Sequence, residues 1–156
     1  MRKLILLTVS HALVALAGFA AGIYALPILT APEEPSASQI ATAIENAEYE
    51  GRFRRDLAGS DFLHWGDGIV TVGRDYISLQ GRIAPGPDYK LYLSPEFVET
   101  EKDFARARAG MKRVGDVKTF ENFVVPVPDS IDITSYSTVI VWCESFGEFI
   151  TAAEYR

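Results

Sequence analysis

The sequence predicts an all-β domain of the β-sandwich type with short helical insertions, preceded by one N-terminal transmembrane helix. Three observations favour this fold class. A long uncharged segment opens the chain, short runs rich in β-branched and aromatic residues follow, and turn-forming residues separate those runs. The chain has 156 residues, of which 48% are hydrophobic and 23% are charged. This length and composition suit one core, so we expect a single folded domain after the helix.

The first element is the segment from Leu4 to Leu29, which holds no Asp, Glu, Lys or Arg over 26 positions. About 20 apolar residues suffice to cross the hydrocarbon core of a bilayer as a helix. Arg2 and Lys3 precede every acidic residue, and positive charges keep the adjoining end of a span in the cytoplasm. We therefore expect residues 1–30 to anchor the chain in membrane lipid, as a single-pass protein with its C-terminal domain outside the cytoplasm.

A cleaved signal peptide is the alternative for this segment, because Ala15-Leu16-Ala17 has the small-residue pattern of a cleavage site. Cleavage there would leave the apolar stretch GFAAGIYALPIL exposed, and the apolar run exceeds the roughly 7 to 15 residues of a usual signal core. An uncleaved anchor is the preferred interpretation. A lipoprotein is excluded, because no cysteine lies near the N-terminus to be acylated.

Gly18 and Gly22 form a GxxxG pattern inside the expected helix, flanked by Ala15, Ala21 and Ala25. A face of small residues lets a second helix approach closely, so the pattern allows a homodimer through Gly18 and Gly22. The pattern is weak because small residues are common in membrane spans generally, and a face that only contacts lipid is the preferred interpretation.

Residues 31–50 are expected to form a linker and a short helix before the domain, which we place at residues 51–156. TAPEEPSAS is rich in Pro, Ser and Ala and reads as an extended linker. Ser36 followed by Gln39 offers a capping box, and Ile40, Ile44 and Ala47 at helical spacing predict a short amphipathic helix.

Five strands are predicted in the domain from runs of β-branched and aromatic residues, namely Ile69–Val72, Tyr76–Gln80, Tyr89–Ser94, Glu121–Val127 and Thr138–Cys143. The turn formers GDG, GRD and APGPD lie between them, at spacings typical of a sandwich or barrel. Thr100 with Asp103, followed by FARARA and Gly110, predicts a capped surface helix inserted between strands.

Charge and residue usage exclude several kinds of function. After Arg2 and Lys3 the chain carries 13 basic and 21 acidic side chains, a net charge of −8, which disfavours nucleic acid as a partner. Outside the anchor there is one cysteine, Cys143, one histidine, His64, and one methionine, Met111. A blue-copper site needs two histidines and a thiolate, and a structural zinc site needs four Cys or His ligands, so no metal site is expected in one copy.

Other chemistries find little support in the sequence. Two isolated residues, His64 and Met111, are weak grounds for a haem, although that ligation is formally possible. No G-x-S-x-G, P-loop or dinucleotide-binding glycine pattern is present, so hydrolase and nucleotide chemistry are not indicated. A classical enzyme is therefore not expected.

The motif order HWGDGIVTV from His64, GPDYKLYLS from Gly86 and YSTVIVWCESF from Tyr136 resembles the extracytoplasmic all-β "DM thirteen" domain, classed as an electron-transfer domain. The resemblance runs from about Gly51 to Ala153, and its most specific piece is the Trp-Cys dipeptide at the end of the late strand. It implies a β-sandwich-like module with a redox role centred on Cys143, and His64 as a possible neighbour. The stretch TFENFVVP departs from the family's pattern, so no contact of that loop is carried over.

The residues around Cys143 also allow a purely structural interpretation of this cysteine. In TVIVWC both alternating sets are apolar, which is typical of a central strand covered on both faces. A buried free cysteine then acts as a small hydrophobe. The neighbouring Glu144 would raise the pKa of the thiol, which argues against strong activation. Likewise, a histidine at a strand entrance such as His64 more often caps a backbone group.

Two hypotheses follow. The first is a membrane-tethered redox or electron-transfer module that uses Cys143, with an unknown redox or protein partner and an unknown cofactor. The second is a non-catalytic interaction or structural module displayed on the membrane surface. The aromatic residues, including Tyr92 and Trp142, are mainly expected in the core, where those two could also line an electron path. A solvent-accessible Cys143 close to His64 favours the first hypothesis, and a Cys143 sealed between two sheets favours the second.

Overall fold

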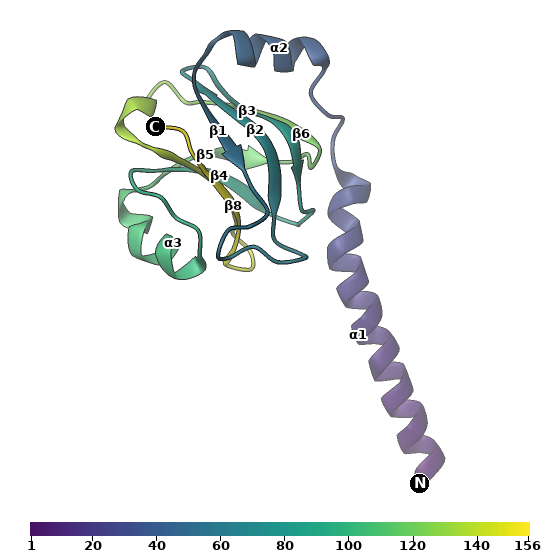
Figure 1. Cartoon of the computed structure of the whole chain (residues 1–156). Helices are drawn as coiled ribbons and strands as arrows, with labels where there is room; N and C mark the ends of the chain where they lie inside the picture. The colour runs from purple at the N-terminus through teal and green to yellow at the C-terminus, as the bar shows by residue number, and fades with distance from the viewer.

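A long apolar helix leads into a domain of two stacked four-stranded antiparallel sheets (Figure 1). The computed structural model describes residues 1–156. The helix, α1 (Arg2–Thr30), projects away from the domain and is long and apolar enough to cross a membrane. The predicted fold class, an all-β sandwich preceded by one such helix, is confirmed.

The first sheet has the strand order β1-β2-β3-β6, built from β1 (Ala47–Phe53), β2 (Gly66–Gly73), β3 (Tyr76–Ile83) and β6 (Asn122–Pro126). The second sheet has the order β5-β4-β7-β8, built from β5 (Lys112–Val117), β4 (Tyr89–Ser94), β7 (Thr138–Cys143) and β8 (Glu148–Glu154). The main apolar core lies between the two inner faces. The sheets also approach each other along their sides, where β1 lies beside β8 and β5 beside β6.

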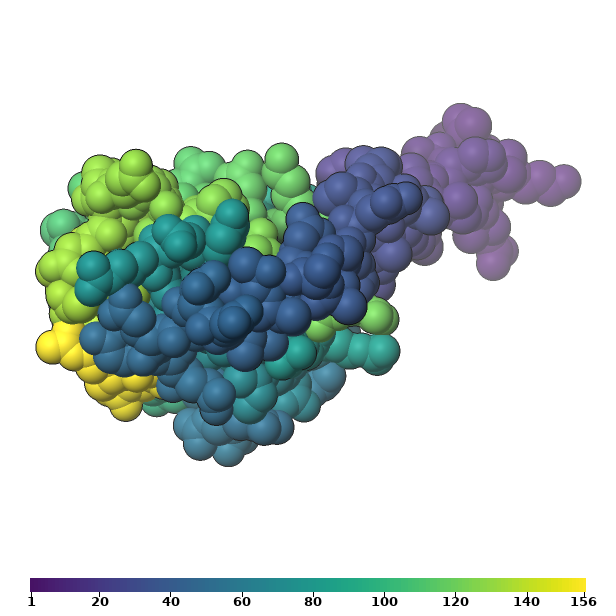
Figure 2. Space-filling model, turned by 90° about the horizontal axis from the view of Figure 1, so that it is seen from above, coloured from purple at the N-terminus to yellow at the C-terminus, as the bar shows by residue number.

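Short helices cover the ends and the outer face of the sandwich. The helix α2 (Ala37–Glu45) begins with the predicted capping box of Ser36 and Gln39 and crosses the top of the domain (Figure 2). The helix α3 (Glu101–Ala107) is capped by Thr100 as predicted and continues into the 3-10 turn η1 (Arg108–Gly110). A second 3-10 turn, η2 (Ile133–Ser135), precedes β7.

The strand β7 is buried along its whole length because it is covered on both faces. Its inward residues, Val139, Val141 and Cys143, join the core between the sheets. Its outward residues, Ile140 and Trp142, pack under α3 in a second, smaller core. The expectation of a central strand covered on both faces is therefore confirmed.

The structure corrects several local predictions. Strands β1, β5 and β8 were not predicted, and β1 begins at Ala47, a residue assigned to the short helix. The GDG stretch was interpreted as a turn, but it lies inside β2, where Gly68 pairs with Gly81 of β3. Both glycines have positive φ and their backbones are so close that a Cβ on either would meet the other strand, which explains why glycine occupies this paired position.

Candidate functional site

A cavity of about 420 Å³ lies between one end of the domain and α1. Its walls come from α1, the segment around His64, the loop between β3 and β4, and the hairpin between β7 and β8. Most of the lining is hydrophobic, and four side chains with titratable groups reach it from the domain: His64, Tyr89, Cys143 and Glu148. An apolar cavity with a few polar groups is the usual form of a small-molecule site.

Cys143 ends β7 on the inner face of the second sheet, directly opposite Tyr89 of β4. The residue is only 3% exposed and belongs to the main core, yet it also lines the cavity. Burial raises the pKa of the Cys143 thiol above its ordinary value, and the backbone N–H groups of Phe146, Asp88 and Ser145 near the sulfur offset this only in part. The thiol is therefore neutral at pH 7, with backbone donors already placed around the sulfur.

Asp88 ties together the two loops that flank Cys143. Its backbone carbonyl accepts a hydrogen bond from Glu144 at 2.9 Å, and its carboxylate accepts one from the Ser145 hydroxyl at 2.8 Å. Lys90 lies 2.6 Å from the same carboxylate, and this contact together with the Ser145 bond lowers the pKa of Asp88. The β7–β8 hairpin is thus held against the β3–β4 loop over the sulfur.

Asp88, rather than Glu144, is the carboxylate whose charge opposes ionisation of Cys143. The Glu144 side chain instead accepts hydrogen bonds from Tyr92 at 2.9 Å and from Arg108 at 3.2 Å. The sequence predicted that Glu144 raises the pKa of the thiol, and this is wrong because Asp88 is the carboxylate that does so. The Glu144 side chain points instead toward Tyr92 and Arg108.

His64 lines the same cavity as Cys143 and is held by Asp61. The His64 Nδ1 lies 3.1 Å from one oxygen of Asp61, while the other oxygen accepts the backbone N–H groups of Leu63 and His64, each at 2.7 Å. Burial raises the pKa of Asp61, but these bonds outweigh it, so the pKa lies below its usual value. Backbone N–H groups are capped at this turn as expected, but the Asp61 carboxylate caps them and His64 does not. The same carboxylate orients the His64 ring.

Tyr89 and the helix α1 are parts of the cavity that were not identified from the sequence as site residues. Burial raises the pKa of Tyr89 well above its ordinary value, so its phenol stays neutral. Gly86 packs directly against this phenol, and a Cβ there would collide with the ring. Only the cross-strand register of β4 and β7, which the sequence does not display, brings Tyr89 opposite Cys143.

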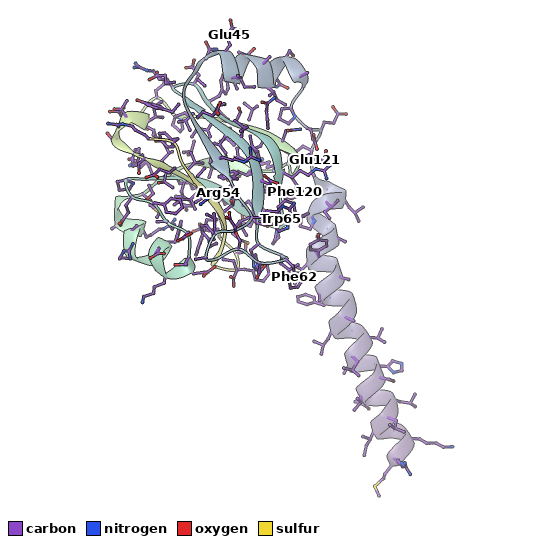
Figure 3. All side chains as sticks on the ribbon, in the orientation of Figure 1. Glu45, Arg54, Phe62, Trp65, Phe120 and Glu121 are labelled. Atoms are coloured by element: carbon purple, nitrogen blue, oxygen red, sulfur yellow. The ribbon has the colours of Figure 1, made fainter.

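One face of α1 borders the hollows at this end of the domain through Ala20, Ile23, Tyr24 and Pro27, which follow helical spacing, while no residue of the helix is buried. Ala20, Ile23 and Tyr24 form the helix wall of the cavity. Further along, Tyr24 and Ile28 lie beside a neighbouring hollow lined by Trp65 and Phe120, which Figure 3 shows on the side of the domain that faces the helix. The long apolar helix therefore forms one wall of the cavity.

The remaining sequence candidates lie elsewhere. Met111 packs against the smaller core under α3, whereas His64 lines the cavity, so the structure does not bring these two together. Tyr92 and Trp142 do gather in that smaller core, where Phe104 stacks on Trp142 at 3.7 Å and meets Tyr92 edge-on at 5.4 Å. No group of three or more His, Cys, Asp or Glu side chains is arranged for a metal ion.

Comparison with known proteins gives one match. The family model described as electron transfer DM13 matches residues 58–155, which is more than half of the chain. The matched segment includes His64, Tyr89 and Cys143, and it ends with β8. No curated protein and no solved structure matches the chain.

Proposed function

Because this chain belongs to the electron-transfer DM13 family, we propose that it is a membrane-anchored, extracytoplasmic redox module in which Cys143 is the redox-responsive group. His64 is the neighbouring group that assists proton transfer. Residues 1–30 are the anchor, residues 31–50 the linker and short helix, and residues 51–156 the redox domain. Membership in the family supports a redox role in general, and the cavity supports the choice of residues.

The observation that carries this proposal is that Cys143 and His64, far apart in the sequence, line one cavity. Because Cys143 lines the cavity, we infer that a small reactant can reach its sulfur, which is otherwise packed in the core. With Nδ1 engaged by Asp61, the Nε2 atom of His64 is the nitrogen left to accept a proton in the cavity. A redox-active thiol needs both access and a proton acceptor.

A single cysteine cannot form a disulfide within its own chain, so its oxidation takes another route. A hydroperoxide can transfer one oxygen to the thiol, giving a sulfenic acid on Cys143 and an alcohol or water as the other product. The thiol proton passes to the leaving oxygen, and in this proposal His64 relays it. A thiol of a partner protein then condenses with the sulfenic acid, releasing water and forming a mixed disulfide.

The alternative function is a non-catalytic interaction module displayed on the membrane. One observation favours it: Cys143 is 3% exposed and packs with the apolar residues of the main core. Burial of this kind is common for structural cysteines. The two functions differ in whether the sulfur reacts in the folded protein.

The test uses the full chain in lipid nanodiscs. Hydrogen peroxide and a small thiol reagent are added in native buffer, and modification of Cys143 is followed by mass spectrometry. We expect modification well before unfolding, and none in Cys143→Ser. Modification that requires denaturant would overturn the redox proposal and leave the display module as the function.

Three further variants, one of them a control, separate the parts of the site. His64→Asn should slow the oxidation, while His11→Asn, the matched change at the other histidine, should leave it unchanged. Asp88→Asn should speed modification, because it weakens the tie between the two loops over the sulfur. Equal rates in all three variants would show that neither the imidazole nor the loops control the thiol.

We also propose that the anchor pairs two copies through Gly18 and Gly22. No domain atom lies within 4 Å of a side chain added at either position, so this face of α1 is open to a second helix. Gly18→Leu and Gly22→Leu should each weaken dimerisation in an association assay of the anchor in membranes, since a bulky side chain separates the backbones. Unchanged dimerisation would contradict this pairing.

A further inference from the structure

We propose that Phe62, Leu63 and Phe146 form a bilayer-contact surface, which rests in the outer interface of the membrane that α1 spans. This inference rests on the membrane anchor of the proposed function. It adds a second point of membrane contact, made by the domain itself, and places the mouth of the Cys143 cavity at the lipid surface.

The three residues are exposed apolar side chains on two loop tips. Phe62 is 85% exposed, Phe146 is 54% exposed and Leu63 is 40% exposed. Phe62 and Leu63 belong to the turn built around Asp61, and Phe146 lies in the hairpin between β7 and β8. Figure 3 shows Phe62 at the edge of the domain beside α1, on the side toward the N-terminal end of the helix. Grouped exposed apolar side chains of this size mark interaction surfaces.

The lining of the cavity places these loops at a definite level along α1. Leu63 and Phe146 line the cavity together with Ala20, Ile23 and Tyr24 of the helix. Counting from Leu4, the first residue after the two basic ones, about 20 residues cross the hydrocarbon core and reach Ile23. The outer boundary of the hydrocarbon therefore falls at the level where the loop tips meet the helix.

Residue type and charge identify lipid as the occupant. Phe and Leu side chains enter the membrane interface by apolar burial, and Tyr24 of α1, a residue type enriched at the interface, lies at the same level. The nearby charged groups Asp61 and Glu148 are acidic, so attraction to anionic lipid does not drive the contact. Apolar burial does, and zwitterionic lipid should serve as well as anionic lipid.

The experiment places a tryptophan at each tip in the full chain, reconstituted in phosphatidylcholine nanodiscs. Phe62→Trp and Phe146→Trp are compared with Tyr76→Trp, which is 37% exposed in the native residue and lies beside α2 at the other end of the domain. Emission of the native Trp65 and Trp142 is measured in the wild type and subtracted. Brominated lipids quench tryptophans that contact the acyl chains.

We expect brominated lipid to quench Phe62→Trp and Phe146→Trp several-fold more strongly than Tyr76→Trp, with the same result when a fraction of the lipid is anionic. Equal quenching at the three positions would overturn the surface. Emission shifted to shorter wavelength without lipid quenching would also overturn it, by showing that a second copy covers the tips. Strong quenching only in anionic lipid would overturn the proposal that apolar burial drives the contact with lipid.

A separate measurement distinguishes failure of this surface from failure of the anchor. Wild-type membranes are washed with alkaline carbonate, which removes peripheral proteins and retains spanning ones. A chain that is retained but shows no tip quenching refutes the contact surface alone. A chain that is released refutes the anchor on which the surface rests.

Discussion

Cys143 occupies two environments at once, the apolar core on one side and, on the other, the cavity and the nearby backbone N–H groups of Phe146, Asp88 and Ser145. This explains how one residue meets the description of both a structural and a reactive cysteine. The core limits ionisation of the thiol. The backbone N–H groups can donate hydrogen bonds to a polar or charged side chain that replaces Cys143. The two sides make separable predictions for stability and for reactivity.

The first prediction concerns stability. Cys143→Ser should lower the free energy of unfolding by less than about 1 kcal/mol, because the amides of Phe146, Asp88 and Ser145 can bond the hydroxyl. Val141→Thr, two residues earlier on the same face and fully buried, should cost about 1 to 3 kcal/mol, since its hydroxyl enters an apolar core. Thermal or chemical unfolding of the full chain in detergent measures both. Equal losses would show that the amides do not serve the side chain.

The second prediction concerns pH. Because burial raises the pKa of Cys143 above the ordinary 9.0, the thiolate fraction, and with it the labelling rate, should still be rising above pH 9.0. A matched exposed thiol, Ser38→Cys in the Cys143→Ser background, should level off at lower pH. Rates are measured with a thiolate-specific reagent across the range where the fold is intact. A plateau for Cys143 below that of the reference would contradict the effect of burial.

At the scale of elements, β7 divides the domain into two packed layers. Cys143 and the cavity lie on its inner face, and Trp142 lies on its outer face under α3, where Phe104 stacks on the indole at 3.7 Å. The helix insertion between β4 and β5 therefore supports the strand that carries the thiol. The helix α3 is more than a solvent-exposed surface helix, because its residues Phe104 and Ala107 are buried against the sheet.

The third prediction follows from this packing. Phe104→Ala should cost about 3 to 5 kcal/mol in the free energy of unfolding, because it leaves a cavity against Trp142 and Tyr92. Phe97→Ala, at a residue that is 36% exposed, is the matched control and should cost less than about 1 kcal/mol. Unfolding by denaturant measures the difference. Similar costs would mean that α3 does not support β7.

Sequence patterns predicted elements whose apolar residues are concentrated, such as β4 and β7, and the capped helices α2 and α3. They did not predict β1, in which Glu48, Glu50 and Arg52 alternate with the inward residues, nor β5 and β8, whose glycine or alanine content weakens the strand signal. Such strands form because neighbouring strands supply the hydrogen bonds and the core. That contribution comes from tertiary structure and is not visible in a short window.

The site shows the same limit. Cys143 and His64 stand out in the sequence because each is the only residue of its type outside the helix. That they line one cavity, with Tyr89 opposite the thiol and α1 as a wall, depends on strand register and on where the helix meets the domain. Neither quantity can be read from residue types alone.

At the scale of the whole molecule, the fourth prediction concerns topology. The chain should stay full-length in the membrane, with residues 31–156 outside the cytoplasm, because α1 is long, apolar and flanked by basic residues only at its N-terminus. Intact-mass measurement of the membrane-extracted chain and protease added to intact cells check both parts. A soluble mature chain that begins near Gly18 would contradict an uncleaved anchor.

In the proposed topology the outer turns of α1 belong both to the membrane span and to the wall of the cavity. This makes the site sensitive to bilayer thickness. The helix has 29 residues, but Ala20, Ile23, Tyr24 and Pro27 face the domain, so in the proposed topology little of it remains to adjust to a thicker membrane. A span longer than the hydrocarbon thickness is accommodated by tilting the helix, and a shorter span by thinning of the lipid around it. Tilting here would draw the helix wall away from Tyr89 and Cys143 and reshape the cavity. Thin membranes should therefore loosen the cavity, and thicker ones should thin around the helix and leave the cavity intact, so the lipid around the protein would tune the reactivity of its only thiol.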